Sequence, residues 1–227
     1  MKCVLNKNIS KEVSEYFFNK NYEIIYTEKS GMVSGSVGYH HDIQFASINS
    51  ILFTSSEFFK YFSKYTDKIL VSENELTSPY PFDALFNFLK IGNIIFGNKN
   101  CLDKVVLDYI YKNNIEFCHV NQGYTNCSSL PVSDTAVITS DNGMKNVFEK
   151  YGFDVLNIDN STIKLDGFKN GFIGGASCRI RDEIIFFGNI KSHPDYDRIA
   201  LFLKKHNKIY KEFSFPLEDF GGAVFFE

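Results

Sequence analysis

The 227-residue sequence contains no tryptophan, only three arginines, and five cysteines at irregular positions 3, 101, 118, 127 and 178. An odd number of cysteines without paired spacing argues against a disulfide framework. The sequence has no Cys-x-x-Cys pair, HExxH segment or other His/Cys cluster with ligand spacing. We therefore expect no metal and no cofactor.

Positive charge is also scarce. The chain has 24 lysines and arginines against 27 acidic residues, which gives a net charge of -3 at pH 7. Nucleic-acid binding depends on a basic surface and is not expected. No apolar run approaches the roughly 18 residues that a membrane helix needs, so no membrane partner is expected either. The first residues turn polar too soon for a signal peptide, and we expect a cytoplasmic protein.

The sequence is rich in aromatic side chains and contains an internal repeat. Its 24 Phe and 13 Tyr supply apolar surface for a single domain, predicted over residues 1–227. Five segments each have the pattern of an apolar strand, an amphipathic helix and a second strand. The helices are predicted near 10–19, 56–65, 102–112, 142–151 and 194–206, and the second strands over 22–26, 68–71, 115–118, 153–156 and 208–211.

The spacing of the repeat predicts a closed ring. The strands that directly precede the helices begin near residues 4, 51, 94, 136 and 184, at intervals of 47, 43, 42 and 48 residues. Passing from the C-terminus back to the N-terminus gives 47 again. A further short strand precedes each unit, over 42–46, 83–87, 128–132, 172–176 and 222–226. The last of these lies at the C-terminus, so the first unit would take its opening strand from the far end of the chain. Such closure removes exposed sheet edges.

Five ββαβ units in a closed ring resemble the pentein, or guanidino-group-modifying-enzyme, fold, a five-bladed α/β propeller. The resemblance covers the whole chain. Within this fold the sequence is most similar to an uncharacterised clostridial family, through the segments GYHHDI (38–43), GYTNCS (123–128), GFIGGAS (171–177) and PLEDFGG (216–222). The glycine-rich segment 171–177 lacks a dinucleotide-binding register, and its small residues are expected to make room at the centre of the ring.

The resemblance implies chemistry on guanidino or amidine groups. In such enzymes carboxylates bind the planar guanidinium, a Cys thiolate attacks its carbon, and a His with an acidic neighbour moves protons. The family's Cys typically follows a Gly-Gly pair near the C-terminus. Here no Cys follows Gly221 and Gly222, and Phe226 stands roughly in that place. The usual nucleophile is therefore absent, moved or lost with the activity.

Polar residues at the starting ends of the predicted inner strands are the candidate site residues. His40 and Asp42 would face the same side of a strand and share a proton network; alternatively they belong to a turn, with Asp42 capping backbone N–H groups. Cys127 is the candidate nucleophile, although a buried cysteine acting as a small hydrophobe is the common alternative. Cys178 is a weaker second candidate. The candidate substrate-binding residues are Asp83, Glu218, Asp219 and Asn126.

Two functions follow from these residues. The first is a Cys-dependent hydrolase or transferase acting on guanidino or amidine-type small molecules, with Cys127, His40 and Asp42 as the catalytic residues. The alternative is a catalytically inactive pentein that binds a small cationic metabolite or a protein partner. The expected small-molecule ligand is a cation, and the sequence leaves the oligomeric state open.

Overall fold

The computed structural model describes residues 1–33 and 35–226, so residues 34 and 227 of the predicted domain lie outside the described residues. These residues form five three-stranded sheets. The first strands of the sheets are β3 (Phe45–Ile48), β6 (Leu89–Ile91), β9 (Ser129–Ser133), β12 (Ser177–Ile180) and β15 (Val224–Phe226). The middle strands are β1 (Lys2–Leu5), β4 (Ile51–Thr54), β7 (Ile94–Gly97), β10 (Ala136–Thr139) and β13 (Glu183–Phe186). The third strands are β2 (Glu23–Tyr26), β5 (Ile69–Val71), β8 (Glu116–His119), β11 (Asp154–Asn157) and β14 (Ile209–Lys211).

All five sheets have the same topology. The first strand pairs antiparallel with the middle strand, and the middle strand pairs parallel with the third. Because a parallel pair needs a long crossover, a helix joins the middle and third strands of each unit. These helices are α1 (Lys11–Asn19), α3 (Ser56–Phe62), α4 (Lys104–Lys112), α5 (Asn142–Lys150) and α6 (Tyr196–Lys205). The predicted α/β fold of five ββαβ units is confirmed.

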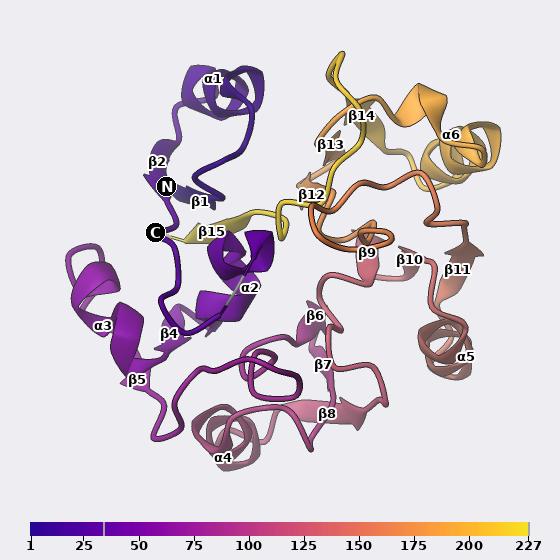
Figure 1. Ribbon diagram of the computed structural model, residues 1–227. Helices are drawn as coiled ribbons and strands as arrows, with labels where there is room; N and C mark the ends of the chain where they lie inside the picture. The colour runs from indigo at the N-terminus through magenta and orange to yellow at the C-terminus, as the bar shows by residue number, and fades with distance from the viewer. Residues whose placement is uncertain (34, 227) are drawn as a thin grey trace.

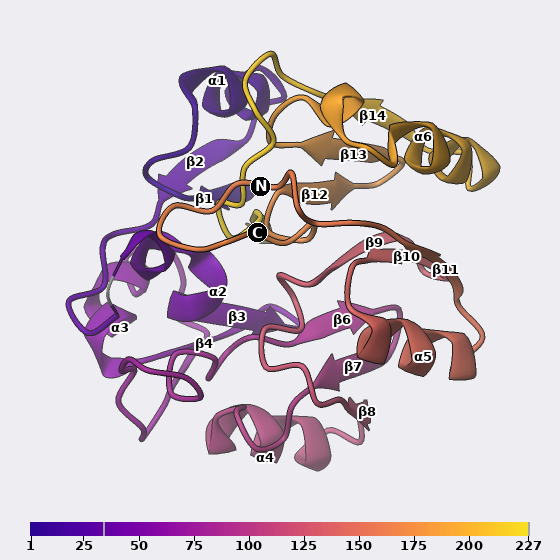
Figure 2. The ribbon, with the colours of Figure 1, turned by 45° about the vertical axis from the view of Figure 1, so that its right-hand side comes forward.

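The two ends of the chain complete one sheet together. Its strand order is β15-β1-β2, with Lys2 opposite Phe226 and Val4 opposite Val224. The two termini lie side by side in both views (Figures 1 and 2). The first unit therefore takes its opening strand from the C-terminus, as the spacing of the repeat predicts.

The five first strands enclose one cavity. Figure 1 shows the units following one another around a common centre, with α1, α3, α4, α5 and α6 at the periphery. A cavity of about 450 Å³ is lined by residues from β3, β6, β9, β12 and β15. We call it the axial channel. Around it, buried Phe, Ile, Leu and Val side chains form the core between the sheets and the helices.

The predicted positions of three of the first strands are wrong. Residues 42–46, 83–87 and 172–176 were expected to be strands, but the strands β3, β6 and β12 begin three to six residues later, at Phe45, Leu89 and Ser177. The segment before β3 is instead a short helix, α2 (His41–Gln44), preceded by a 3-10 turn at Ser36–Tyr39. The other two segments are turns.

Tight hairpins explain the shift. β3 and β4 are separated by only two residues, Asn49 and Ser50, both with positive φ, and in the other two hairpins Gly92 and Arg181 also have positive φ. Two-residue hairpins of this kind match the twist of the paired strands. Each first strand must therefore end directly before its middle strand, and the polar segments upstream are free to form turns.

A further 3-10 turn, Ile190–Ser192, precedes α6.

Candidate functional site

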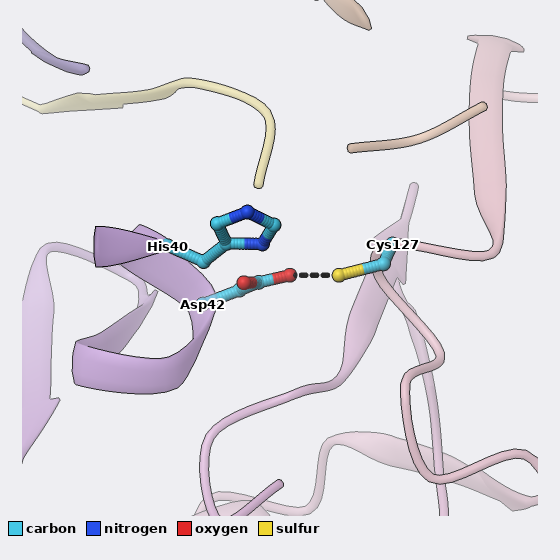
Figure 3. A group of neighbouring side chains, drawn as sticks. All are labelled: His40, Asp42 and Cys127. Atoms are coloured by element: carbon cyan, nitrogen blue, oxygen red, sulfur yellow. Dashed lines mark hydrogen bonds between the residues drawn. The ribbon is translucent and has the colours of Figure 1, made fainter. Parts of the chain in front are cut away.

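Asp42 is the centre of a buried polar cluster. It lies in α2 and is only 2% exposed. Its Oδ2 atom accepts a hydrogen bond from the Cys127 thiol at 2.5 Å and another from Asn87 Nδ2 at 2.9 Å. Asn126 Nδ2 lies at 3.4 Å from the same oxygen. Figure 3 shows Asp42 and Cys127 facing each other across the site.

His40 reaches the same cluster from the position directly before α2. Its backbone is extended, with φ -69° and ψ 132°, so the chain turns into the helix just after this residue. One possible metal-ligand atom from each of His40, Asp42 and Cys127 lies within 4.8 Å of the other two (Figure 3). The prediction that His40 and Asp42 converge because they share a strand is wrong, since residues 41–44 are helical. The turn between an extended residue and a helix brings them together instead.

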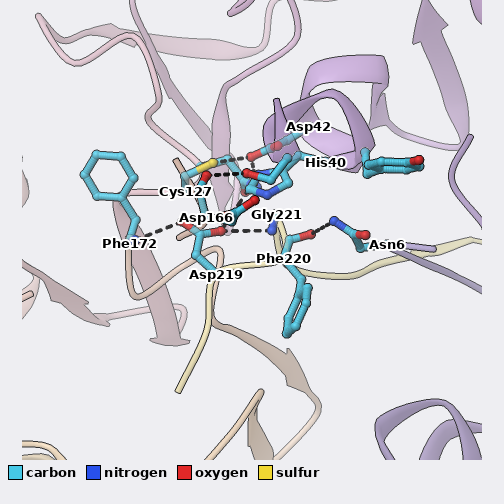
Figure 4. A network of polar contacts seen from close by, with 12 residues as sticks. Asn6, His40, Asp42, Cys127, Asp166, Phe172, Asp219, Phe220 and Gly221 are labelled. Carbon is cyan, nitrogen blue, oxygen red and sulfur yellow. Dashed lines mark hydrogen bonds and ion pairs between the residues drawn. The ribbon is translucent and has the colours of Figure 1, made fainter. Parts of the chain in front are cut away.

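Asp219 forms the other side of the cluster. Its Oδ1 atom lies 3.8 Å from His40 Nδ1 and accepts a hydrogen bond from the Gly221 backbone N–H at 2.9 Å. Its Oδ2 atom accepts from the Phe172 N–H at 2.8 Å. Figure 4 shows this network joining the loop before β15 to His40 and Cys127. The carboxylate is thus held by backbone groups of two different segments.

Glycines make the room that Asp219 needs. A Cβ atom at Gly175 would lie 1.9 Å from Asp219 Oδ1, and one at Gly171 would lie 2.6 Å from Asp219 Cβ. Gly221 has φ +80°, and a Cβ there would lie 2.6 Å from His40 Cβ. The glycine-rich segment 171–177 was expected to provide space at the centre of the ring, and two of its glycines, Gly171 and Gly175, provide space for this carboxylate.

Asn87 is a site residue that the sequence analysis missed. Its side chain is fully buried, donates to Asp42 Oδ2, lies 3.5 Å from Cys127 Sγ, and accepts a hydrogen bond from the Asn126 backbone N–H at 2.8 Å. It therefore links three candidate residues. The available signal was a lone amide between Phe86 and Phe88, because a polar residue inside an apolar run is buried only when it is hydrogen-bonded.

A cavity of about 420 Å³ opens beside the cluster, and we call it the site cavity. His40, Cys127 and Asp219 of the cluster line it, as do Asp83 and Tyr124. The Tyr124 hydroxyl donates to Asp83 Oδ2 at 2.8 Å. The remaining lining residues are Val37, Ile43, Asn160, Leu165, Phe168, Lys169, Asn170 and Phe172. The structure therefore brings a thiol, an imidazole and two carboxylates to the wall of one cavity.

Other predicted residues lie outside the site cavity. Asn126 and Asp42 line the axial channel, and Glu218 lines a neighbouring cavity together with His40, Asp166 and Asp219. Glu218 is half-buried, and its backbone forms a bridge with that of Lys164. Cys178, the second candidate thiol, lines the axial channel and packs in the core with Cys3.

Phe226, which stands where related sequences are expected to carry Cys, lies in β15 away from the cluster. It is half-buried and lines a small cavity together with Tyr65 and Lys68. A cysteine at this position would not face His40 and Asp42. The thiol of Cys127 is the one that the fold places beside them.

Burial sets the electrostatics of the site. Desolvation raises the pKa of the Asp219 carboxyl above its usual value, although His40 and two backbone N–H groups oppose the rise. Desolvation also raises the pKa of Asp83. For the Cys127 thiol, desolvation and then the negative charges of Asp42 and Asp219 raise the pKa well above its ordinary value. Without a ligand, Cys127 is therefore a protonated thiol.

The donor atoms of His40, Asp42 and Cys127 are also near enough to one another to hold a metal ion. Cys127 lies 85 residues from Asp42 along the chain, so no local ligand spacing marks the three residues in the sequence. The expectation that the protein binds no metal stays a prediction.

Among the described residues, no helix has the length and apolar character needed to cross a membrane.

Comparison with solved structures defines the class of fold. An inosamine-phosphate amidinotransferase from Streptomyces griseus matches with a TM-score of 0.59 at 9% identity, covering 94% of this chain and 77% of that chain. A DDAH from Pseudomonas aeruginosa, a mutant in complex with citrulline, matches with a TM-score of 0.58 at 8% identity, over 90% and 80% of the two chains. A C. jejuni agmatine deiminase matches with a TM-score of 0.50 at 14% identity, over 93% and 74%. These likenesses show that the chain has the pentein fold.

The family follows from the sequence itself. A family model described as "Family of unknown function (DUF6873)" matches residues 4–224, and the chain belongs to this family. Among curated proteins, no sequence matches the chain significantly.

Proposed function

We propose that this protein is a Cys-dependent enzyme that acts on a guanidino or amidine group of a small molecule, as a hydrolase or a transferase. The observation that carries the proposal is the convergence of the Cys127 thiol, the His40 imidazole and the Asp42 and Asp219 carboxylates on one buried cluster. The printed descriptions of the structural neighbours, which are deiminases, dimethylarginine hydrolases and amidinotransferases, support the same class of substrate.

The site has the charge that a cationic ligand requires. Asp42, Asp83 and Asp219 are each at least nine-tenths buried, and none forms an ion pair with a lysine or arginine among the described residues. One oxygen of Asp42 and one of Asp83 have no hydrogen-bond partner there. Buried carboxylates are costly unless they are paired. A planar guanidinium or amidinium would supply both positive charge and several N–H donors.

The rest of the site cavity suits an apolar chain that carries such a group. Val37, Ile43 and Phe172 line the wall beyond the carboxylates, and the exposed Lys169 and Phe168 lie on the lining contributed by the loop before β12. A methylene chain would pack against the apolar wall. With a volume of about 420 Å³, the cavity fits a small molecule rather than a polymer.

In the proposed reaction a bound cation first lowers the pKa of the Cys127 thiol, because it neutralises the carboxylates that raise it. The thiol proton passes to His40, and the thiolate adds to the guanidino carbon, which forms a C–S bond. The C–N bond to the leaving amine then breaks as His40 returns the proton to that nitrogen. Cys127 is left carrying an amidino group.

The amidino group is removed in one of two ways. In a hydrolase, water adds to its carbon while His40 accepts a proton, and cleavage of the C–S bond releases a urea-type product and the thiol. In a transferase, an amine adds in place of water and leaves as a new guanidine. Both routes regenerate Cys127 and consume no redox equivalent.

A catalytically inactive protein that binds the same kind of cation, or a protein partner, is the second candidate. Two observations favour it: the thiol pKa is raised strongly by burial, and no cysteine follows Gly221 and Gly222. In this case the carboxylates alone bind the ligand and Cys127 remains a hydrogen-bond donor to Asp42.

The two functions are separated by a combined binding and turnover screen with L-arginine, agmatine and methylated arginines. Binding is measured as an increase in the midpoint of thermal unfolding, since a ligand that binds the native state stabilises it. Turnover is measured as formation of a ureido product or, with an added amine, of a new guanidine. The variants are Cys127→Ser, with Cys178→Ser as a matched buried-cysteine control.

The enzyme proposal expects turnover of at least one compound, lost in Cys127→Ser and retained in Cys178→Ser. The binding proposal expects stabilisation by a ligand in both variants and product in none. Absence of both stabilisation and turnover across the cationic compounds would refute both proposals.

A further inference from the structure

We propose that the mouth of the axial channel, on the hairpin side of the ring, is a binding site for a small organic anion bearing a phosphate or carboxylate group. Its basic residues are Lys90, Arg179 and Arg181, which come from two different units and line one cavity of about 450 Å³. Its lining shares no residue with that of the site cavity, although Asp42, which bonds Cys127, and Asn126 line it.

The concentration of positive charge is unusual for this chain. Its net charge is -3 and it has only three arginines, yet two of these arginines and a lysine stand at one mouth. Lys90 is exposed and its amine has only a 3.4 Å contact with the Asn49 side chain. Clustered cations repel one another unless an anion lies between them. Asp134 pairs with Arg179, whereas Lys90 and Arg181 have no carboxylate partner among the described residues, so these two favour anion binding at this point.

Arg179 is held in a fixed orientation. Both of its Nη atoms lie 3.1 Å from Asp134 Oδ1, and its Nε donates to the Arg181 carbonyl oxygen at 3.3 Å. These bonds use three of the five N–H groups of the guanidinium and leave two for another acceptor. A guanidinium that is already oriented loses less conformational entropy on binding an oxyanion.

Arg181 occupies a position that the turn alone does not explain. It begins the two-residue hairpin between β12 and β13 with φ +54°, a conformation that favours Gly, Asn or Asp. It is exposed, and no hydrogen bond or ion pair of its guanidinium is found among the described residues. Its side chain is thus available at the mouth of the channel.

The interior of the channel provides polar groups for the rest of the ligand. His41 is 3% exposed, lines the channel, and its Nδ1 has no hydrogen-bond partner in the described part of the chain. Ser47 and Asn126 also line the channel, each half-buried. The cavity is larger than an inorganic phosphate ion requires. We therefore infer an organic ligand whose anionic group lies at the basic mouth and whose polar body extends inward.

The test is isothermal titration calorimetry with inorganic phosphate and with citrate as separate probes, at constant ionic strength. The double variant Lys90→Gln/Arg181→Gln removes the two basic side chains that are not held by a carboxylate. Arg198→Gln and Lys112→Gln are matched controls, because both residues are exposed and neither lines the channel. Thermal unfolding of each variant in the absence of probe establishes that it is folded.

We expect saturable binding of at least one probe to the unmodified chain at one site per molecule, weakened at least tenfold in the folded double variant and changed less than twofold in the controls. The tighter probe identifies phosphate or carboxylate as the recognised group. Binding of neither probe, or equal binding to the double variant and the controls, would overturn the proposal. Cys127 does not line the channel, so we expect Cys127→Ser to bind the probes as the unmodified chain does, which separates this test from that of the proposed activity.

Discussion

Cys127 and Asp42 come from units two apart in the chain, and the thiol of one donates a hydrogen bond to the carboxylate of the other at 2.5 Å. The contact holds the thiol in its protonated form, because a thiolate would stand beside a negative charge in a buried site. In the proposed function the same carboxylate would both bind the cationic group and keep the Cys127 thiol protonated. A cation that binds Asp42 would release this restraint.

Asp42→Asn is expected to lower the apparent pKa of the Cys127 thiol by about one unit or more, since a neighbouring charge typically shifts a pKa by one to three units. The measurement is the rate of Cys127 alkylation by iodoacetamide as a function of pH, followed by mass spectrometry without ligand. Glu218→Gln is the control, since Glu218 lies outside the site cavity. An unchanged or higher apparent pKa in Asp42→Asn would contradict the assigned electrostatics.

Asp83→Asn is expected to increase stability relative to the unmodified chain at pH 7–8, with the difference vanishing near pH 4. Desolvation raises the pKa of Asp83 above its ordinary 3.8. The folded state therefore binds this proton more tightly, and the contribution of Asp83 to stability is lost as the pH rises through its folded-state pKa. Thermal unfolding between pH 4 and pH 8 measures the effect.

The control for Asp83→Asn is Asp197→Asn, an exposed carboxylate in the first turn of α6. It should show no comparable dependence on pH. A loss of stability in Asp83→Asn that is the same at every pH would mean that the carboxylate is needed structurally for its hydrogen bond with Tyr124.

The fold was predictable where local patterns are strong. The middle strands β4, β7 and β10 match the predicted residues, because each is a short apolar run followed by a helix with an amphipathic stripe. The first strands β3, β6 and β12 were misplaced. Their positions depend on hairpins whose left-handed residues include Asn49, Ser50 and Arg181, and Ser and Arg are not typical signals for such turns.

The site was predictable where the residue type itself carries chemistry. His40, Asp42, Cys127 and Asp219 were found because an imidazole, a thiol and carboxylates stand out in a sequence. Asn87 was missed, since an amide has no titratable group and its role depends on three long-range hydrogen bonds. The sequence also gives no sign that Asp219 lines the site cavity whereas its neighbour Glu218 lines only the adjoining one, because this depends on the direction of the chain before β15.

Asn87→Ala is expected to destabilise the fold by about 1–3 kcal/mol, the usual cost of leaving buried hydrogen-bonding groups unpaired. The substitution removes the acceptor of the Asn126 N–H and a donor to Asp42. Urea denaturation gives the change in the free energy of unfolding. Asn113→Ala, whose side chain bonds the Tyr109 carbonyl at an exposed helix end, should change it by less than about 0.5 kcal/mol. Equal effects of the two substitutions would argue against a buried network.

Gly175→Ala tests whether the glycine-rich segment is required for Asp219. The added methyl group would lie 1.9 Å from Asp219 Oδ1, so either the carboxylate or the backbone must move. Overpacking of this kind typically costs about 1–3 kcal/mol, which urea denaturation would detect. Because His40 lies beside Asp219, a folded variant should also lose stabilisation by cationic ligands. In the control Gly31→Ala, the new methyl group would lie 3.5 Å from its nearest neighbour. This variant should keep the free energy of unfolding and the stabilisation by cationic ligands of the unmodified chain. A Gly175→Ala protein that behaves the same way would show that Asp219 does not depend on this space.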